Sequence, residues 1–191
     1  MKNYLSISSL IPSFNKVLDV PGDKSLSIRW VLLASQATGK SKAYNLLESG
    51  DVISAIISMR KLGVKILKRR GFYEINGVGL SGFRHKNNLN LNAGNSGTFA
   101  RLLCGTLAGN VKNVKVTGDS SLSKRDFSRV VKPLKLFGVS IKTKKNKLPI
   151  TIKGSKYLRP ISYKEEKGSA QVKSAILLAS LNTPGQTVVK S

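Results

Sequence analysis

Two patterns of apolar and polar positions alternate along this chain. The first consists of longer apolar or amphipathic runs that are typical of helices, at 25–35, 51–62, 96–107, 127–137 and 169–180. The second consists of shorter runs rich in β-branched and other apolar residues, which predict strands at 16–20, 41–45, 64–68, 73–76, 88–91, 114–117, 139–143, 149–152, 157–163 and 187–189. Helices and strands that alternate in this way predict an α/β fold.

A short motif shows that the pattern repeats. Lys-Leu-Gly-Val-Lys-Ile at 61–66 returns as Lys-Leu-Phe-Gly-Val-Ser-Ile at 135–141, which places Gly138 75 residues after Gly63. In both copies an amphipathic run meets a glycine and then a β-branched alternation. This order predicts a helix, a C-terminal glycine cap and a strand.

A second marker recurs three times with a similar period. A glycine is followed within a few residues by a serine and an apolar helical run at Ser25, Ser96 and Ser169, spaced by 71 and 73 residues. Each run carries a basic residue about one turn in: Arg29, Arg101 and Lys173. The period is too long for a solenoid and predicts repeated βαβαββ units, with helices packed inside and sheets outside.

The repeat predicts the domain organisation. We expect an N-terminal segment at 1–19, a first βαβαββ unit at 20–84, a second at 85–156 and an incomplete third at 157–191. The third pattern stops one strand after its first helix, so we expect this chain to be the amino-terminal fragment of a longer protein whose second domain is absent.

Composition narrows the class of protein. The chain has 191 residues, 40% of them hydrophobic, and none of its apolar runs reaches the roughly 20 residues that span a bilayer, so we expect a cytoplasmic protein without membrane contact. Its single cysteine, Cys104, excludes an internal disulfide and a cysteine-cluster metal site. We expect it to be a buried core residue.

The net charge of +24 raises the question of a nucleic-acid partner. The basic residues are spread along the whole chain, only 9 of the 33 are Arg, and the aromatic content is 6%, so no basic stripe is interleaved with aromatic residues. We therefore expect no nucleic acid.

The three serine-led helix starts carry the candidate chemistry. Free backbone N–H groups, helix dipoles and serine hydroxyls at one place favour an anion. Lys24, Arg29, Arg101 and Lys173 add positive charge beside them. The alternative for each serine is that it only caps its helix. Three copies with the same basic accompaniment favour a shared site for phosphates and carboxylates.

At this point the residues resemble a known family. Pro-Gly-Asp-Lys-Ser-Leu-Ser-Ile-Arg at 21–29 is similar to the first signature of the 5-enolpyruvylshikimate-3-phosphate synthases (3-phosphoshikimate 1-carboxyvinyltransferases), and Asn-Ala-Gly-Asn-Ser-Gly-Thr at 92–98 followed by Arg101 resembles the second. Weaker matches follow at 118–125 and 168–171. The resemblance implies the inside-out α/β barrel of the enolpyruvyl transferases.

The resemblance also implies roles for individual residues. Lys24 would touch both substrates, shikimate 3-phosphate and phosphoenolpyruvate, with Ser25 and Arg29 on the shikimate phosphate ester. Gly97, in a loop with Asn95 and Thr98, would lie against phosphoenolpyruvate, and Arg125 would hold its anionic groups. The shikimate side would be lined by Ser169, Ala170 and Gln171, with Gln171 near both ligands.

The resemblance also implies that the catalytic acid and base are missing from this chain. Enolpyruvyl transfer needs a base for the attacking hydroxyl and an acid for the methylene carbon. None of the nine carboxylates matches the family's catalytic Asp and Glu, which we expect beyond Ser191, although Asp51 and Asp126 could lie near the site. We expect no metal or organic cofactor, a monomeric full-length enzyme, and no turnover by this chain alone. His85, in a polar link, is not expected to be catalytic.

Two alternatives remain open at this stage. The related transferase acting on UDP-N-acetylglucosamine shares the implied fold and chemistry, but has Lys-Asn where this chain has Lys24-Ser25, and it uses a loop cysteine. A basic protein that binds phosphate-rich ligands or nucleic acid would use the same helix starts without catalysis.

Overall fold

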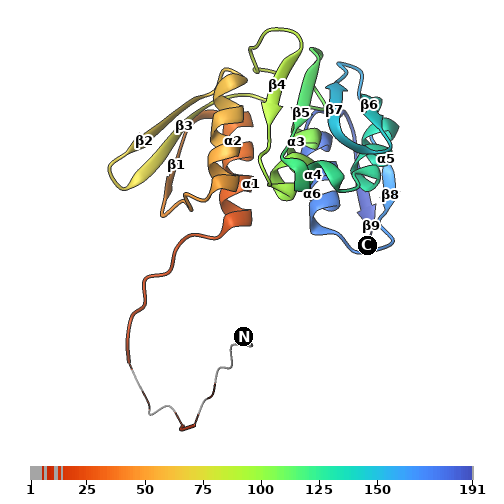
Figure 1. Ribbon diagram of the computed structural model, residues 1–191. Coiled ribbons are helices and arrows are strands. Elements are labelled where there is room, and N and C mark those ends of the chain that lie inside the picture. Colours follow the sequence, from red (N-terminus) through yellow and green to blue (C-terminus); the bar gives the residue numbers. More distant parts are fainter. Residues whose placement is uncertain (1–5, 7, 11–12, 14, 191) are drawn as a thin grey trace.

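The computed structural model describes residues 6, 8–10, 13 and 15–190 (Figure 1). The helices and strands follow one another as α1 Lys24–Gln36, β1 Thr38–Tyr44, α2 Gly50–Lys61, β2 Lys65–Arg69, β3 Phe72–Val78, β4 Leu89–Asn92, α3 Gly97–Thr106, β5 Val114–Thr117, α4 Ser120–Lys124, α5 Ser128–Leu136, β6 Ser140–Lys144, β7 Lys147–Lys153, β8 Ser162–Lys164, α6 Ala170–Ser180 and β9 Val188–Lys190.

The strands form three sheets outside the helices (Figure 1). The first has the order β1-β3-β2 and is antiparallel. The second has the order β4-β5-β7-β6, in which only β4 and β5 are parallel. The third is the parallel pair β8-β9. In β7 the side chains of Leu148, Ile150 and Ile152 are buried while their neighbours face outward or are half-buried, as expected for a sheet with one face on the core.

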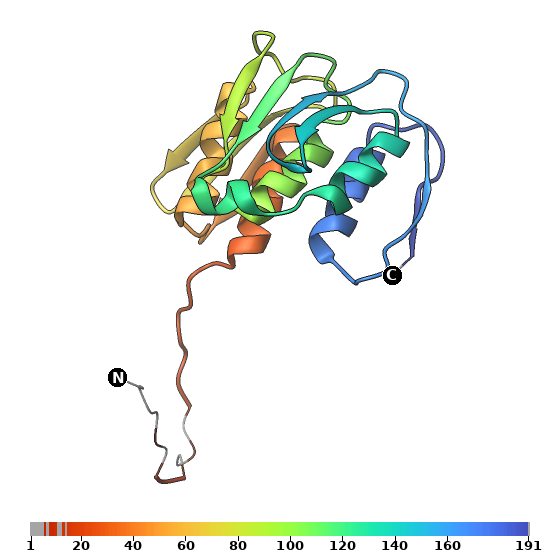
Figure 2. The same cartoon turned by 45° about the vertical axis from the view of Figure 1, so that its right-hand side comes forward.

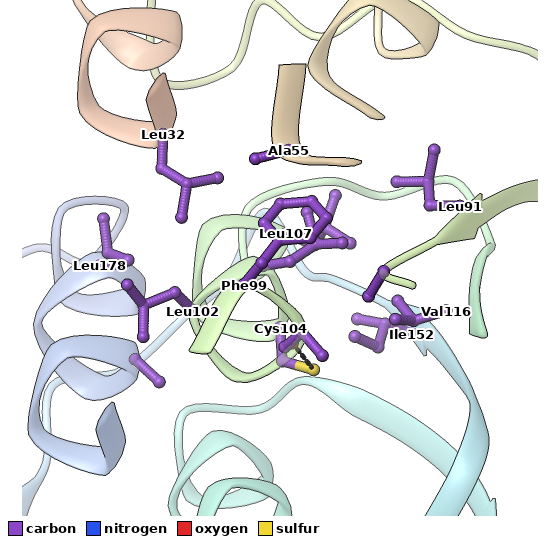
Figure 3. Packing of buried hydrophobic residues seen from close by; sticks show 14 of the residues in the cluster. Leu32, Ala55, Leu91, Phe99, Leu102, Cys104, Leu107, Val116, Ile152 and Leu178 are labelled. Carbon is purple, nitrogen blue, oxygen red and sulfur yellow. Dashed lines mark hydrogen bonds between the residues drawn. The ribbon is translucent and has the colours of Figure 1, made fainter. Parts of the chain in front are cut away.

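Helix α3 lies at the centre of the molecule. Its residues are buried almost all round, and it packs against α1, α2, α5 and α6. Figure 3 shows Phe99 and Leu102 of α3 among Leu32 of α1, Ala55 of α2 and Leu178 of α6. A helix that is apolar on every side needs partners on every side, so α3 takes the core position.

The repeated motif folds in the same way both times. Gly63 and Gly138 have φ values of 91° and 99°, in the left-handed region that glycine tolerates best. Each donates its N–H three residues back, and the next residue donates five residues back, Val64 to Met59 and Val139 to Leu134. Both are Schellman caps, so the predicted helix, glycine and strand are confirmed.

Most predicted elements are present within a few residues, but two strands are wrong. Residues 16–20 form no strand; Val17 and Val20 are 94% and 68% exposed, and residues 15–19 extend away from the packed elements (Figure 2). No strand in the described part of the chain pairs with residues 16–20, and the Val20 carbonyl accepts instead from the Asn45 side chain at 2.9 Å. An apolar alternation without a partner strand forms no ladder. The N-terminal segment predicted at 1–19 lies partly outside the described residues, at 1–5, 7, 11–12 and 14.

The strand predicted at 157–163 is present only as β8, at its far end. Tyr157 is 90% exposed, and Pro160 has no N–H to give to a ladder. The short helix α4 was not predicted, because its five residues are too few for a helical period to show. None of the helices in the described part of the chain has the length and hydrophobicity needed to cross a membrane.

Candidate anion-binding site

The three predicted helix starts differ in how they are capped. Ser96 accepts a hydrogen bond from the N–H of Phe99 at 3.2 Å, and Ser169 accepts one from Val172 at 3.4 Å, so both hydroxyls serve as N-caps. Ser25 does not cap α1: Asp23 does, accepting from Leu26 at 2.7 Å, and Ser25 lies in the first turn. The N-cap of this helix is therefore two residues earlier than Ser25. Asp23 is the last residue with extended backbone, and its carboxylate can accept from the first turn.

Hydrogen bonds join the first turns of α3 and α6. Gln171 of α6 donates to the Thr98 hydroxyl at 2.9 Å and accepts from Nη1 of Arg101 at 3.1 Å. Arg101 also donates to the carbonyls of Gly97 and Asp126, each at 3.2 Å, and its guanidinium lies 4.8 Å from the centre of the Phe127 ring. Figure 2 shows α1, α3 and α6 starting on the same side of the molecule. Arg101 thus connects two helix starts to the loop before α5.

Arg125 completes this cluster from the end of α4. Its Nη2 donates to Oδ1 of Asn95 at 3.2 Å, and Asn95 donates in turn to Asp119 at 2.6 Å. Gly97 permits the approach, because a Cβ there would lie 2.8 Å from Nη1 of Arg101 and 2.9 Å from Nη1 of Arg125. Two guanidinium groups therefore meet over a residue without a side chain.

A cavity of about 460 Å³ opens beside these groups. It is lined by Arg101, Arg125, Asp126, Phe127, Arg129, Val130, Ser169, Gln171 and Val172. Of the nine site residues predicted from the sequence, Arg125, Ser169 and Gln171 line this cavity, and Asn95 and Gly97 contact or adjoin Arg125. The volume is enough for a small anionic metabolite or part of a larger one.

The charges around the cavity are mostly positive. Burial lowers the pKa of the Arg101 guanidinium, and the like charges of Arg125 and Arg129 lower it further. The hydrogen bond from the Ser128 hydroxyl lowers the pKa of Asp126, as does the N–H of Ser128, so this carboxylate is charged and already bound. An anion placed between the guanidinium groups would relieve their repulsion.

The remaining predicted residues lie outside that cavity. Arg29 donates to the Ser25 carbonyl at 3.1 Å and to the Ser174 hydroxyl of α6 at 3.2 Å. Lys24 lies 3.4 Å from the carboxylate of Asp51 and is about half exposed. Ala170 is the exposed first residue of α6. Arg29 is thus joined to α6, whereas the observed partner of Lys24 belongs to α2.

Two other residues considered in the sequence are not part of this site. Cys104 is buried and donates to the Ala100 carbonyl at 3.1 Å, and burial raises the pKa of its thiol to about 12, which confirms a core role. His85 lies between β3 and β4, with ring nitrogens 2.7 Å from the Lys86 carbonyl and 3.1 Å from the Asn110 side chain. Within residues 6, 8–10, 13 and 15–190, no group of three or more His, Cys, Asp or Glu could hold a metal ion.

The sequence did not single out Arg129, which also lines the cavity. Arg129 lies four residues after Arg125, and this spacing is the one feature of the sequence that could have pointed to a second arginine near the same site. The sequence predicted Arg101 as a positive charge near a helix start. Its hydrogen bonds to Gly97, Gln171 and Asp126 join separate segments, and the spacing of residues along the chain does not predict them.

The fold and the cavity define an α/β protein whose helix starts surround an arginine-lined site for a small anion. Residues 11–191 match the family model for EPSP synthase (3-phosphoshikimate 1-carboxyvinyltransferase), and the chain belongs to that family.

Three relatives show how far the similarity extends. The chain is 44% identical to a 3-phosphoshikimate 1-carboxyvinyltransferase of Streptococcus mutans and 47% identical to one of Sulfurihydrogenibium sp., in each case over 90% of this chain and 40% of the relative. A solved structure of EPSP synthase from Acinetobacter baumannii superposes with a TM-score of 0.85 at 40% identity, over 90% of this chain and 39% of that one. The chain thus spans about two fifths of the length of these relatives.

Proposed function

We propose that this chain supplies a substrate-binding part of an enzyme that transfers the enolpyruvyl group of phosphoenolpyruvate to shikimate 3-phosphate and releases phosphate. The observation that carries the proposal is the cavity in which Arg125, Ser169 and Gln171 meet, all three of which had been assigned to the substrates from the family's motifs. Arg125 lies 44 residues before Ser169 in the sequence, and the fold brings it to the start of the helix that carries Ser169 and Gln171.

The proposed roles follow the observed contacts. Arg125, with Asn95 and Gly97 beside it, binds the anionic groups of phosphoenolpyruvate. Gln171, in the first turn of α6, is hydrogen-bonded to Arg101 and Thr98 of α3, and from there it can reach both ligands. An Arg offers two parallel N–H donors to a carboxylate or phosphate, whereas a Lys offers a point charge. Arg125 is therefore suited to bind such a group in a fixed orientation.

The phosphate ester of shikimate 3-phosphate is assigned to the start of α6 and to Arg29 of α1, which is hydrogen-bonded to α6. Ser169 and Ala170 begin this helix, and Arg29, with Ser25 on its carbonyl side, is bonded to Ser174 one turn further on. Lys24 is proposed to leave Asp51 for the substrates. Their ion pair is half exposed on the lysine side, and a pair of this kind contributes only about 0–1 kcal/mol, so exchanging it for a bound phosphate is easy.

The chemistry proposed for this chain is electrostatic. Attack of the shikimate hydroxyl on C2 of phosphoenolpyruvate, with the hydroxyl proton taken by a base and a proton delivered to C3 by an acid, gives a tetrahedral adduct. Loss of phosphate from C2 together with a proton from C3 then restores the double bond of the enolpyruvyl group. Fixed cations aimed at the phosphate and carboxylate stabilise the adduct, and one such donor is typically worth about 10²- to 10³-fold in rate. The carboxylate in the cavity, Asp126, has a lowered pKa and two Ser128 donors, so it is a poor proton source at neutral pH.

The general acid and base are therefore proposed to come from elsewhere in the whole protein. The chain alone is expected to bind substrates without turnover. The three units at 20–84, 85–156 and 157–191, the monomeric full-length enzyme, its cytoplasmic location and the lack of any cofactor remain predictions within this proposal.

The test is a titration of the 191-residue chain with shikimate 3-phosphate, alone and with phosphoenolpyruvate, followed by calorimetry. Wild-type chain is expected to bind, and Arg125→Gln to bind phosphoenolpyruvate about tenfold more weakly. Arg70→Gln, which removes the same charge from the exposed turn between β2 and β3, is the control and is expected to bind like wild type. Equal weakening by both variants would show that only net charge matters.

A second candidate, a nucleic-acid or general polyanion binder, is favoured only by the net charge of +24. A titration with a short oligonucleotide over a salt series separates it from the enzyme. Binding of the oligonucleotide with a steep salt slope, together with no response to shikimate 3-phosphate, would overturn the proposed function.

A further inference from the structure

One arginine of the cavity, Arg129, has no role in the proposed function and is paired with a buried carboxylate, that of Glu165. Glu165, directly after β8, is 5% exposed, and its Oε1 pairs with Nη2 of Arg129 from the first turns of α5. The N–H of Lys167 also donates to Oε1, at 3.2 Å, and the N–H of Glu165 donates to the carbonyl of Lys190 on β9 at 2.7 Å. The loop that carries Glu165 is thereby fixed at three points.

The other oxygen of this carboxylate, Oε2, is buried and has no hydrogen-bond partner among the described residues. Leaving one acceptor of a buried carboxylate without a donor is costly, so Glu165 is not placed here for stability alone. The attraction between Glu165 and Arg129 must offset that cost.

Arg129 faces the cavity of the candidate site. Its side chain is 42% exposed and lines the cavity together with Arg101 and Arg125, and it also lines an adjoining cavity of about 510 Å³ together with Glu165. The charge of Arg129 helps to lower the pKa of Arg101, which places the two guanidinium groups near each other. In the part of the chain described here, Glu165 is its one hydrogen-bond partner, and a guanidinium carries five N–H donors. Donors therefore remain for a ligand.

Three guanidinium groups around one cavity repel one another. Arg101 is held by the carbonyls of Gly97 and Asp126, and Arg125 by Asn95. Arg129 is half exposed, so without a fixed partner its long side chain would take other rotamers and move away from the like charges.

We propose that Glu165 is a positioning residue that holds the Arg129 guanidinium against the cavity, and that Arg129 is a third anion-binding arginine of this site. The inference rests on the proposed function and deepens it: the ligand is a small molecule with more than one anionic oxygen group, bound by three guanidinium groups. Glu165 touches no ligand and acts through Arg129.

Glu165 could act through its negative charge or by positioning Arg129, and these two roles predict opposite results when Glu165 is substituted. If Glu165 only placed a negative charge near the site, Glu165→Gln would tighten anion binding. If it positions Arg129, the same substitution weakens binding. Glu165→Asp separates the two further, because it keeps the charge and shortens the side chain by one methylene.

The experiment is an NMR titration of the full 191-residue chain with inorganic phosphate, a probe that needs only the cavity and not the shikimate moiety. We expect Arg129→Gln to weaken phosphate binding about tenfold, and Glu165→Gln and Glu165→Asp to weaken it about three- to tenfold. In the double variant Arg129→Gln/Glu165→Gln, the second substitution should add nothing, because residues that act through each other are not additive. Glu166→Gln, an exposed neighbour, removes the same charge and should leave binding unchanged or slightly tighter.

Circular dichroism and the NMR spectrum of each variant report its fold. If Glu165→Gln does not fold, Glu165→Asp with Arg129→Gln carries the test. Tighter binding by Glu165→Gln, unchanged binding by Glu165→Asp, full additivity in the double variant, or no phosphate binding by the wild-type chain would each overturn the inference. Phosphate binding that follows the expected order while shikimate 3-phosphate does not bind would instead refute the proposed function and leave this inference standing.

Discussion

The close contact between α3 and α6 depends on Gly105, in the last turns of α3. A Cβ built there would lie 2.1 Å from the carbonyl oxygen of Ala175 in α6, 2.8 Å from its carbonyl carbon and 2.9 Å from its Cα. All three atoms belong to the backbone, so no side chain can swing away. Gly105→Ala therefore forces α3 and α6 apart.

The size of the effect follows from this geometry. Real Cβ contacts do not fall below 3.0 Å, so the helices must separate by at least 0.9 Å at this point. Overpacking of a well-packed core costs about 1–3 kcal/mol, whereas alanine in place of glycine within a helix gains about 1 kcal/mol. The core position of α3 leaves no free side toward which it can move, so we expect the upper part of that cost, about 2–3 kcal/mol, and a net loss of about 1–2 kcal/mol.

Thermal and urea unfolding of the purified chain measure this loss. For a chain of this size, 1 kcal/mol corresponds to roughly 2–4 °C in Tm, so a decrease of about 2–8 °C is expected. Gly50→Ala is the matched control: it is also a helical glycine, nothing lies within 4 Å of the added Cβ, and its stability should equal or slightly exceed that of wild type. A Gly105→Ala chain as stable as the control would refute the argument that α3 and α6 are in fixed contact.

Other substitutions and conditions probe the site and the core. Gly97→Ala should leave the Tm within about 2–4 °C of wild type, because the close contacts of its Cβ are with the flexible ends of Arg101 and Arg125 and its contact with Leu122, at 3.7 Å, is an ordinary one. It should still weaken phosphate binding several-fold in the same titration; unchanged binding would contradict the arrangement of the arginines. Cys104, with its thiol pKa raised to about 12 by burial, should resist iodoacetamide at pH 8 in the folded chain and react after unfolding; fast labelling of the folded chain would show that α3 opens readily. The pKa of Asp119 is lowered below its ordinary value of 3.8, chiefly by the N–H of Leu122, so its contribution to stability is present above that pH and is lost as the pH falls through the folded-state value; the stability difference between wild type and Asp119→Asn should shrink toward pH 2, and a difference that stays constant from pH 7 to pH 2 would exclude this role.

Much of the local structure was predictable from short-range signals. The Gly63 and Gly138 motifs predicted their helix ends because a glycine in the left-handed region followed by a β-branched residue leaves few alternatives. Strand 114–117 and the hairpins followed from alternation. Residues 16–20 show the same alternation but no strand, because pairing is decided by a partner and not by the segment itself.

The candidate site was predictable residue by residue but not as an arrangement. Motifs pointed to Arg125, Ser169 and Gln171 separately, and the structure placed them on one cavity. Arg129 and Glu165 were missed, since a lone Arg and a lone Glu 36 residues apart carry no local signal and meet only because α5 and β8 lie side by side in the fold.

The sequence by itself determined the helix ends, the repeat, the buried character of α3 and the family to which the chain belongs, because each depends on neighbours within one or two turns or on motifs of a few residues. Tertiary structure alone decided which arginines share the cavity and that Glu165 pairs with Arg129. The physical reason is that packing brings charges from distant segments within a few ångströms, where their repulsion and pairing become strong, and a linear pattern contains no distance of that kind.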